Sequence, residues 1–147
     1  MRHLLAAGFC VLALAACGGG DESGGESGQS ISGTMTMIGF SAQLEFDSTA
    51  DWGDGCEGRE GYDDIVGGAQ VLVSDEAGTT IASSRLEPGE IVRAHDGIIT
   101  CEWSFEIADV PEAKFYEIEV SRRGGLKYSK AEMEGLDWEV PFFLETS

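Results

Sequence analysis

The residues most clearly arranged for chemistry are residues 14–17, Leu-Ala-Ala-Cys, at the end of an apolar run. Arg2 and His3 precede that run, which is too short to cross a bilayer core as a helix. A basic start, a short apolar segment and small residues before a cleavage point are typical of a secretory signal peptide. A cysteine directly after that point is typical of a bacterial lipoprotein signal. The sequence therefore predicts cleavage before Cys17 and acylation of its thiol.

Residues 18–30 contain only Gly, Ser, Asp, Glu and Gln, so they have no apolar side chain to bury. As a Gly-rich coil these residues span about 20 Å. We expect three parts: a signal peptide at 1–16, a lipidated cysteine with a flexible tether at 17–30, and a folded domain at 31–147. Two or more acyl chains hold a protein stably at a membrane, which predicts a lipid-anchored protein on the extracytoplasmic face of the cell membrane. The alternative is an ordinary secretory signal cut near Ala16, with Cys17 a free thiol.

Two further cysteines, Cys56 and Cys101, remain in the predicted domain. Export delivers them to an oxidising compartment, where a disulfide is expected. A redox-active pair is the alternative, but it usually has a Cys-x-x-Cys spacing that these residues lack. A zinc site formed with His95 would need a fourth ligand. The sequence therefore favours a structural disulfide.

Residues 51–68, DWGDGCEGREGYDDIVGG, form a segment rich in glycine and acidic residues, which we call the acidic loop. The structural interpretation is a shaped loop in which Trp52 and Tyr62 cover the disulfide and Asp63 and Asp64 cap a turn. The functional alternative is that carboxylates converge on a hard cation such as calcium, which takes six to eight oxygen ligands. The carboxylates available for this are Asp51, Asp54, Glu57, Asp63 and Asp64.

Catalytic signatures are scarce. His95 is the only histidine after residue 16, and there is no nucleophile elbow, zinc-protease helix or phosphate-binding loop. Glu57 and Glu60 could serve a glycosidase only if their spacing in the fold were suitable. We assign no catalytic residue, metal ligand or cofactor. A cation-dependent enzyme or surface hydrolase that uses the acidic loop stays as the alternative function.

The chain carries 27 Asp and Glu against 9 Lys and Arg, a net charge of −18. Removing residues 1–16 takes away one Arg and no acid, which makes the charge −19. Such a field repels nucleic acid, whose binding needs a basic patch. The sequence thus excludes a nucleic-acid partner and leaves an envelope protein or glycan as a possible ligand of a monomer.

The domain that positions these residues is expected to be all-β. Apolar residues alternate with polar ones in segments 31–38, 69–74, 101–107, 116–120 and 136–144, as in strands with one buried face. Turns are predicted at 75–78, 87–89 and 122–125, and Ser129 with Glu132 predicts a capped helix that ends at Gly135. Pro141 predicts that the last strand lies at a sheet edge. We expect an antiparallel β-sandwich of seven or eight strands with one short helix, or a small closed barrel.

Seven segments of the domain carry a resemblance: CEGREGYDDI at 56–65, VLVSDEAG at 71–78, CEWSF at 101–105, DVP at 109–111, FYEIEV at 115–120, RG at 123–124 and YS at 128–129. Together they resemble a family of uncharacterised secreted lipoproteins of high-GC Gram-positive bacteria. The resemblance implies that Cys56 and Cys101 match the two family cysteines, and it brings no activity with it. In strand pattern the domain is also similar to transthyretin-like and immunoglobulin-like sandwiches, which implies architecture only.

Overall fold

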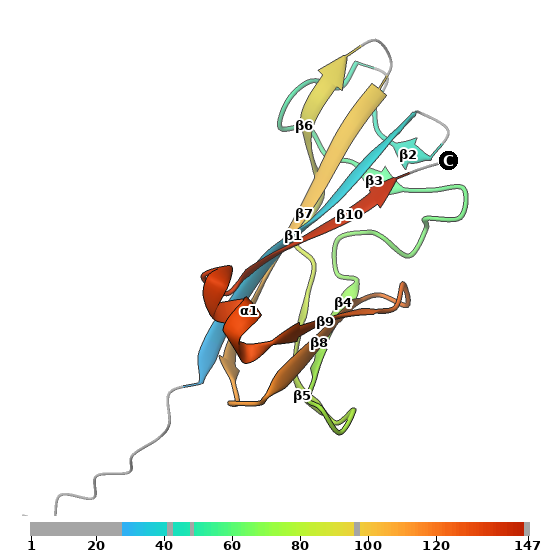
Figure 1. The fold of residues 1–147 in the computed structure, drawn as a ribbon. Helices are drawn as coiled ribbons and strands as arrows, with labels where there is room; N and C mark the ends of the chain where they lie inside the picture. Colours follow the sequence, from blue (N-terminus) through green and yellow to red (C-terminus); the bar gives the residue numbers. More distant parts are fainter. Residues whose placement is uncertain (1–27, 41–42, 48, 96–97, 146–147) are drawn as a thin grey trace, which may run out of the picture.

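The computed structural model describes residues 28–40, 43–47, 49–95 and 98–145, which form two facing four-stranded sheets (Figure 1). Sheet I has the strand order β10-β1-β7-β6, and sheet II has the order β5-β4-β8-β9. The predicted all-β sandwich is confirmed, with eight strands in its two sheets. The elements are β1 (Gln29–Phe40), β2 (Leu44–Glu45), β3 (Glu57–Gly58), β4 (Gln70–Ser74), β5 (Thr80–Arg85), β6 (Glu90–His95), β7 (Ile98–Val110), β8 (Phe115–Val120), β9 (Gly125–Ser129), α1 (Lys130–Gly135) and β10 (Glu139–Glu145).

Strand pairing is antiparallel with one exception. β10 lies parallel to β1, with Ser32 opposite Glu139 and Ile38 opposite Glu145. The expectation of a wholly antiparallel sheet was therefore wrong at this pair. The chain reaches β10 from β9 in sheet II through α1, so it enters sheet I at the same end as β1 and runs in the same direction. A parallel pair needs such a connection rather than a hairpin.

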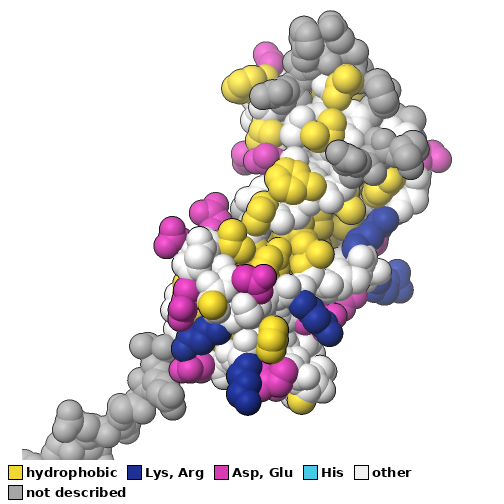
Figure 2. All heavy atoms as spheres, in the orientation of Figure 1, with side chains coloured by type: hydrophobic (Ala, Val, Ile, Leu, Met, Phe, Trp, Pro, Cys, Tyr) yellow, Lys and Arg dark blue, Asp and Glu magenta, His cyan; other side chains and the backbone are white. Residues whose placement is uncertain are grey.

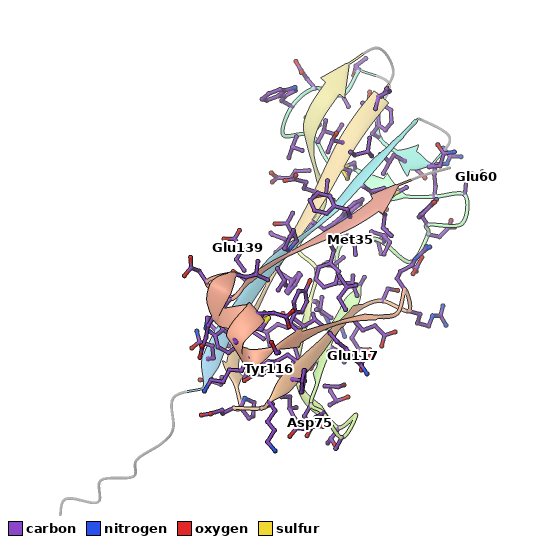
Figure 3. The ribbon with its side chains drawn as sticks, viewed as in Figure 1. Met35, Glu60, Asp75, Tyr116, Glu117 and Glu139 are labelled. Atoms are coloured by element: carbon purple, nitrogen blue, oxygen red, sulfur yellow. A yellow bond between two sulfur atoms is a disulfide. The ribbon has the colours of Figure 1, made fainter. Side chains whose placement is uncertain are left out.

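The core lies between the sheets and follows the predicted alternation. In β7 the side chains of Cys101, Trp103, Phe105 and Ile107 are buried, while Ser104 and Glu106 between them are exposed. Met35 of sheet I and Tyr116 of sheet II are also buried in this layer, and both are labelled in Figure 3. One apolar face from each sheet thus supplies the buried layer that holds the fold together.

The helix and the start of β10 differ in part from expectation. The capping box is present: the Ser129 hydroxyl accepts from the backbone N–H of Glu132, whose carboxylate accepts from the Ser129 N–H. Leu136 and Trp138 were expected in the last strand, but that strand begins at Glu139. Leu136 instead caps the helix, and Asp137 and Trp138 adopt φ of 51° and 61° to turn the chain into β10. At the other terminus of the domain, β1 begins two residues before the predicted position.

One predicted turn joins two paired strands, and another connects the two sheets. Asp75 accepts hydrogen bonds from the backbone of Ala77 and Thr79, and Gly78 has a φ of 75°, as a tight turn requires. Residues 87–89 are not a hairpin turn but the crossover from β5 in sheet II to β6 in sheet I. Gly89 is needed there for space, because a Cβ would overlap the indole Nε1 of Trp103 and lie 2.5 Å from the Cys56 carbonyl oxygen.

The edges of sheet I shape its surface. Pro141 lies in β10, which is an edge strand as predicted. Ser32 donates its N–H to the Trp138 carbonyl at 3.0 Å, so by alternation Val140 and Phe142 bond to β1 and the Pro141 nitrogen faces the open edge. Figure 2 shows hydrophobic side chains gathered along the flank between β10 and the β8–β9 hairpin. Within the described residues, no helix is both long and apolar enough to span a bilayer.

Candidate functional site

The disulfide is the best-defined feature among the predicted site residues. Cys56 and Cys101 are bonded, with their Cα atoms 6.2 Å apart, and both side chains are almost fully buried. Cys101 lies within β7, and Cys56 lies in the acidic loop beside β3. The bond therefore joins the loop to a central strand of sheet I, and the predicted pairing is confirmed.

Backbone hydrogen bonds also attach the residues around Cys56 to β6 and to the segment before it. Gly53 donates to the Ile91 carbonyl at 2.9 Å, and Ile91 donates to the Asp54 carbonyl at 2.9 Å. Cys56 donates to the Gly89 carbonyl at 3.1 Å. Residues 53–56 are thus attached to the start of β6 and to the crossover before it, and with the disulfide they hold one half of the acidic loop rigidly on sheet I.

The aromatic residues of the loop do not both behave as expected. Trp52 was expected to cover the disulfide, but its side chain is 69% exposed. Trp103 takes the buried place near Cys56, next to Gly89, and its Nε1 has no hydrogen-bond partner among the described residues. Tyr62 is half-buried and lies under the guanidinium of Arg123, 4.9 Å from its ring centre. The second half of the loop is therefore held by a cation–π contact rather than by the disulfide.

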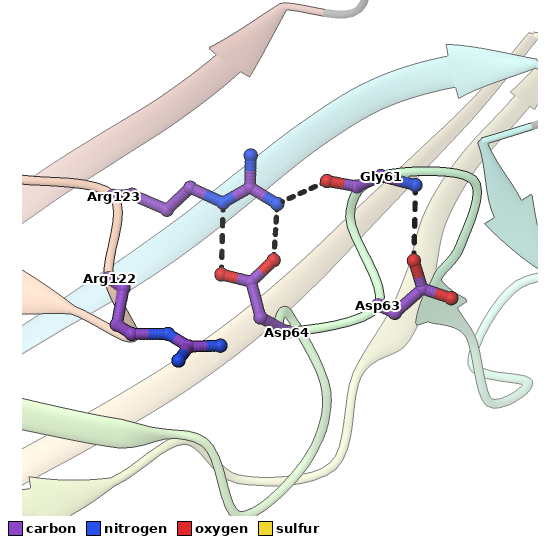
Figure 4. Close-up of a pocket in the computed structure, with 5 residues that line it drawn as sticks. All are labelled: Gly61, Asp63, Asp64, Arg122 and Arg123. Atoms are coloured by element: carbon purple, nitrogen blue, oxygen red, sulfur yellow. Dashed lines mark hydrogen bonds and ion pairs between the residues drawn. The ribbon is translucent and has the colours of Figure 1, made fainter.

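Arg123 and Asp64 form the centre of a shallow hollow between the loop and the β8–β9 hairpin (Figure 4). The Arg123 Nε lies 3.0 Å from Asp64 Oδ2, and its Nη2 donates both to Asp64 Oδ1 and to the Gly61 carbonyl. Burial raises the pKa of Asp64, but the bonds and charge of Arg123 outweigh it and hold that pKa below its usual value. The Asp64 carboxylate is therefore ionised, and the positive charge of Arg123 balances its charge. Such an ion pair holds the loop on the β8–β9 hairpin, but it has no proton to give as a general acid.

The other carboxylates of the loop are used locally. Asp54 accepts from the backbone N–H of Asp51 at 2.7 Å, Asp51 from that of Trp52, and Asp63 from that of Gly61. Asp63 thus caps a turn as expected, whereas Asp64 does not. Such side-chain bonds to neighbouring N–H groups are typical of turns.

The five candidate cation ligands are not brought together. Asp51 and Asp54 lie beside β6, and Asp63 and Asp64 lie beside the β8–β9 hairpin. Glu57 lies opposite Glu45 in the short β2–β3 ladder. Among the described residues no three His, Cys, Asp or Glu side chains are grouped closely enough to hold a metal ion.

The remaining candidates are described only in part. Glu60 has a φ of 51°, and its carboxylate lies 3.8 Å from the Arg59 guanidinium. The backbone of His95 ends β6, and its side chain falls outside the described part of the chain. Cys17 and the tether at 18–27 also fall outside the described residues.

Comparison with known proteins finds no relative of this chain. No protein-family model matches the chain, and no curated protein or solved structure is significantly similar to it. The function must therefore be inferred from these residues.

Sequence reasoning missed one surface feature. Phe143, which lies on β10, is 68% exposed, although it belongs to a strand whose alternate residues are core. The signal was present in residues 141–145, Pro-Phe-Phe-Leu-Glu, where two adjacent aromatic residues cannot both face the core of a strand.

Proposed function

We propose that this chain is a lipid-anchored protein of the cell envelope whose β-sandwich is a non-catalytic binding domain. The proposal rests on three features along the chain. A lipoprotein-type signal ends at Cys17, a segment with no apolar residue follows, and then comes a domain with a buried disulfide. The single observation that carries the proposal is the Cys56–Cys101 bond, because disulfides persist in oxidising compartments outside the cytoplasm.

The structure of the domain suits a rigid binding surface better than a catalytic site. The most polar loop is held on sheet I by the disulfide and backbone bonds, and on the β8–β9 hairpin by Arg123 and Asp64. The Asp64 carboxylate, whose pKa Arg123 holds below its usual value, is a poor acid and base at neutral pH. A rigid surface that keeps its shape when it is free is favourable for binding, because little ordering entropy is lost.

The anchoring part of the proposal is tested by fractionation and intact-mass measurement in the cells that produce the chain. We expect the chain in the membrane fraction, with a mass increase at Cys17 equal to two or three acyl chains. The variant Cys17→Ala should lose that mass and leave the membrane. Cys10→Ala is the matched control, because that cysteine lies in the segment removed with the signal and should change neither result.

The redox part is tested on the same material. Peptide mapping without reductant should recover residues 56 and 101 in one cross-linked species. A soluble chain with an unmodified Cys17 and free thiols at both other positions would overturn the proposal.

A further inference from the structure

β10 is held in its sheet by one neighbouring strand. It lies at the edge of sheet I and pairs with β1 alone among the described strands. The chain reaches it from sheet II through α1 and three further residues, Leu136, Asp137 and Trp138, which we call the hinge. This short connection is therefore what assigns β10 to the sheet of its own chain.

The hinge bends the chain sharply. Asp137 has a φ of 51° and Trp138 a φ of 61°, so two successive residues other than glycine lie in the left-handed region. This conformation is rare for a bulky residue such as tryptophan, and it costs free energy at each position. Asp137 is exposed, and no hydrogen bond or ion pair joins its side chain to any described residue. Its side chain therefore does not offset the cost of the bend.

Packing on the far side of the hinge holds it in this bent form. Val140 and Phe142 of β10 are buried in the core. The indole of Trp138 meets the Tyr116 ring edge-on, with ring centres 5.4 Å apart, and Ser32 donates its N–H to the Trp138 carbonyl at 3.0 Å. These partners belong to β1 and to sheet II. The β10 strand of a second copy, placed at the same position, would make every one of these contacts.

A second copy thus offers β10 the same place without the bend. Exchange of one element between two copies is a low-cost route to a dimer, and a short strained connection favours it. Addition of a second copy along the outer edge of β10 is disfavoured, because Pro141 has no N–H to donate there. The net charge of −18 on each chain also opposes contact between two ordinary surfaces.

We propose that β10 is an exchangeable strand that links two copies of this chain. In the dimer each β10 lies beside β1 of the other copy, and the two hinges extend between the sandwiches. The exchange concerns the folded domain alone and does not depend on acylation of Cys17. Under the proposed function, the dimer would join two binding domains in one unit, which raises avidity for a repeated ligand without any new contact.

The test is a disulfide that forms only between chains. Ser32 lies opposite Glu139 in the β1–β10 pair, and both side chains are exposed. Full-length Ser32→Cys and Glu139→Cys variants are produced together in the same cells, which are then oxidised mildly with copper phenanthroline. Because each variant carries only one of the two introduced thiols, a disulfide between positions 32 and 139 joins two chains. Mass spectrometry of unreduced peptides identifies it.

A second pair of variants measures random collision. Here Lys127→Cys takes the place of Glu139→Cys, because the Lys127 side chain is 69% exposed but belongs to β9 of sheet II. We expect the 32–139 disulfide at a yield about tenfold above that of the 32–127 disulfide, because exchange holds positions 32 and 139 side by side.

The hinge supplies the second readout. Asp137→Gly, added to both chains, should lower the 32–139 yield about tenfold, because glycine adopts a positive φ freely and the monomer then has less strain to release. Glu60→Gly is the matched control. Glu60 has the same φ of 51°, is exposed and carries the same charge, but it lies in the acidic loop, so this variant should leave the yield unchanged.

Three results would overturn the proposal. The first is a 32–139 disulfide no more abundant than the 32–127 disulfide, which would show that β10 stays in its own chain. The second is a 32–139 yield that Asp137→Gly leaves unchanged, and the third is a yield that Glu60→Gly lowers as strongly. Either of these would show that strain in the hinge does not drive the association.

Discussion

Breaking the Cys56–Cys101 bond should cost the domain a large part of its stability. The bond closes a loop of 45 residues. In the chain-entropy treatment, a cross-link of that span restricts the unfolded chain by about 4 kcal/mol at 25 °C. A domain of this size has an unfolding entropy near 0.25 kcal/mol per kelvin, so the thermal midpoint should fall by about 16 °C. The double variant C56A/C101A should show this loss.

The assay is equilibrium unfolding in guanidinium, followed by far-UV circular dichroism, with and without dithiothreitol. The parent protein should lose about 4 kcal/mol on reduction. The double variant should already be that much less stable and should not respond to reductant, which separates the bond from any effect of the alanines. Equal midpoints for oxidised and reduced parent protein would refute this reasoning, because the tie between the acidic loop and β7 would then contribute nothing.

Three further outcomes are expected. Gly89→Ala should destabilise the domain by about 2 kcal/mol, since its methyl group meets the buried Trp103 indole, whereas Gly135→Ala, with open space around it, should be neutral or stabilising in thermal melts. The depressed pKa of Asp64 means that its bond to Arg123 stabilises the fold above the pKa of an unfolded aspartate, about 3.9, and is lost as the pH falls below it. Asp64→Asn should therefore cost about 1 kcal/mol at pH 7 and progressively less below pH 4, as measured by urea titration. Calcium at about 1 mM should leave the melting temperature unchanged, because the carboxylates of the acidic loop lie apart, and a rise of several degrees would contradict this.

Periodicity in the sequence was enough to predict most of the core. The alternation in segments 69–74, 101–107 and 116–120 is a local property, and the structure buries the faces that it predicted. Three strands of the two sheets, β5, β6 and β9, were not among the predicted segments, because their alternation is weak. In β5 the sequence is Thr-Ile-Ala-Ser-Ser-Arg, and none of its side chains is fully buried. Their strand geometry comes from pairing with neighbours, which a single segment does not reveal.

The partners of each strand were harder to predict than the strands themselves. Nothing in residues 139–145 distinguishes a parallel neighbour from an antiparallel one, because side chains alternate in both. The left-handed Asp137 and Trp138 mark where the helical segment becomes a strand, but neither residue type predicts a positive φ at two successive positions.

The candidate site was predictable only in part. Two cysteines in a domain predicted to be exported leave one intramolecular pairing, so Cys56 and Cys101 could be paired from sequence. The fate of the acidic residues depended on Arg123, which is 59 residues from Asp64 along the chain. Such contacts between distant segments are set by topology and not by local spacing.

The parallel pairing of β1 with β10 has a consequence for the order of events in biogenesis. The first strand of the domain is the neighbour of β10, so sheet I lacks an edge strand until residues 139–145 have been synthesised and have paired with β1. Contacts between the two ends of a chain form slowly, because a long loop must close first. Completion of sheet I by β10 is therefore expected to be a late step in folding, after the local hairpins of sheet II have formed.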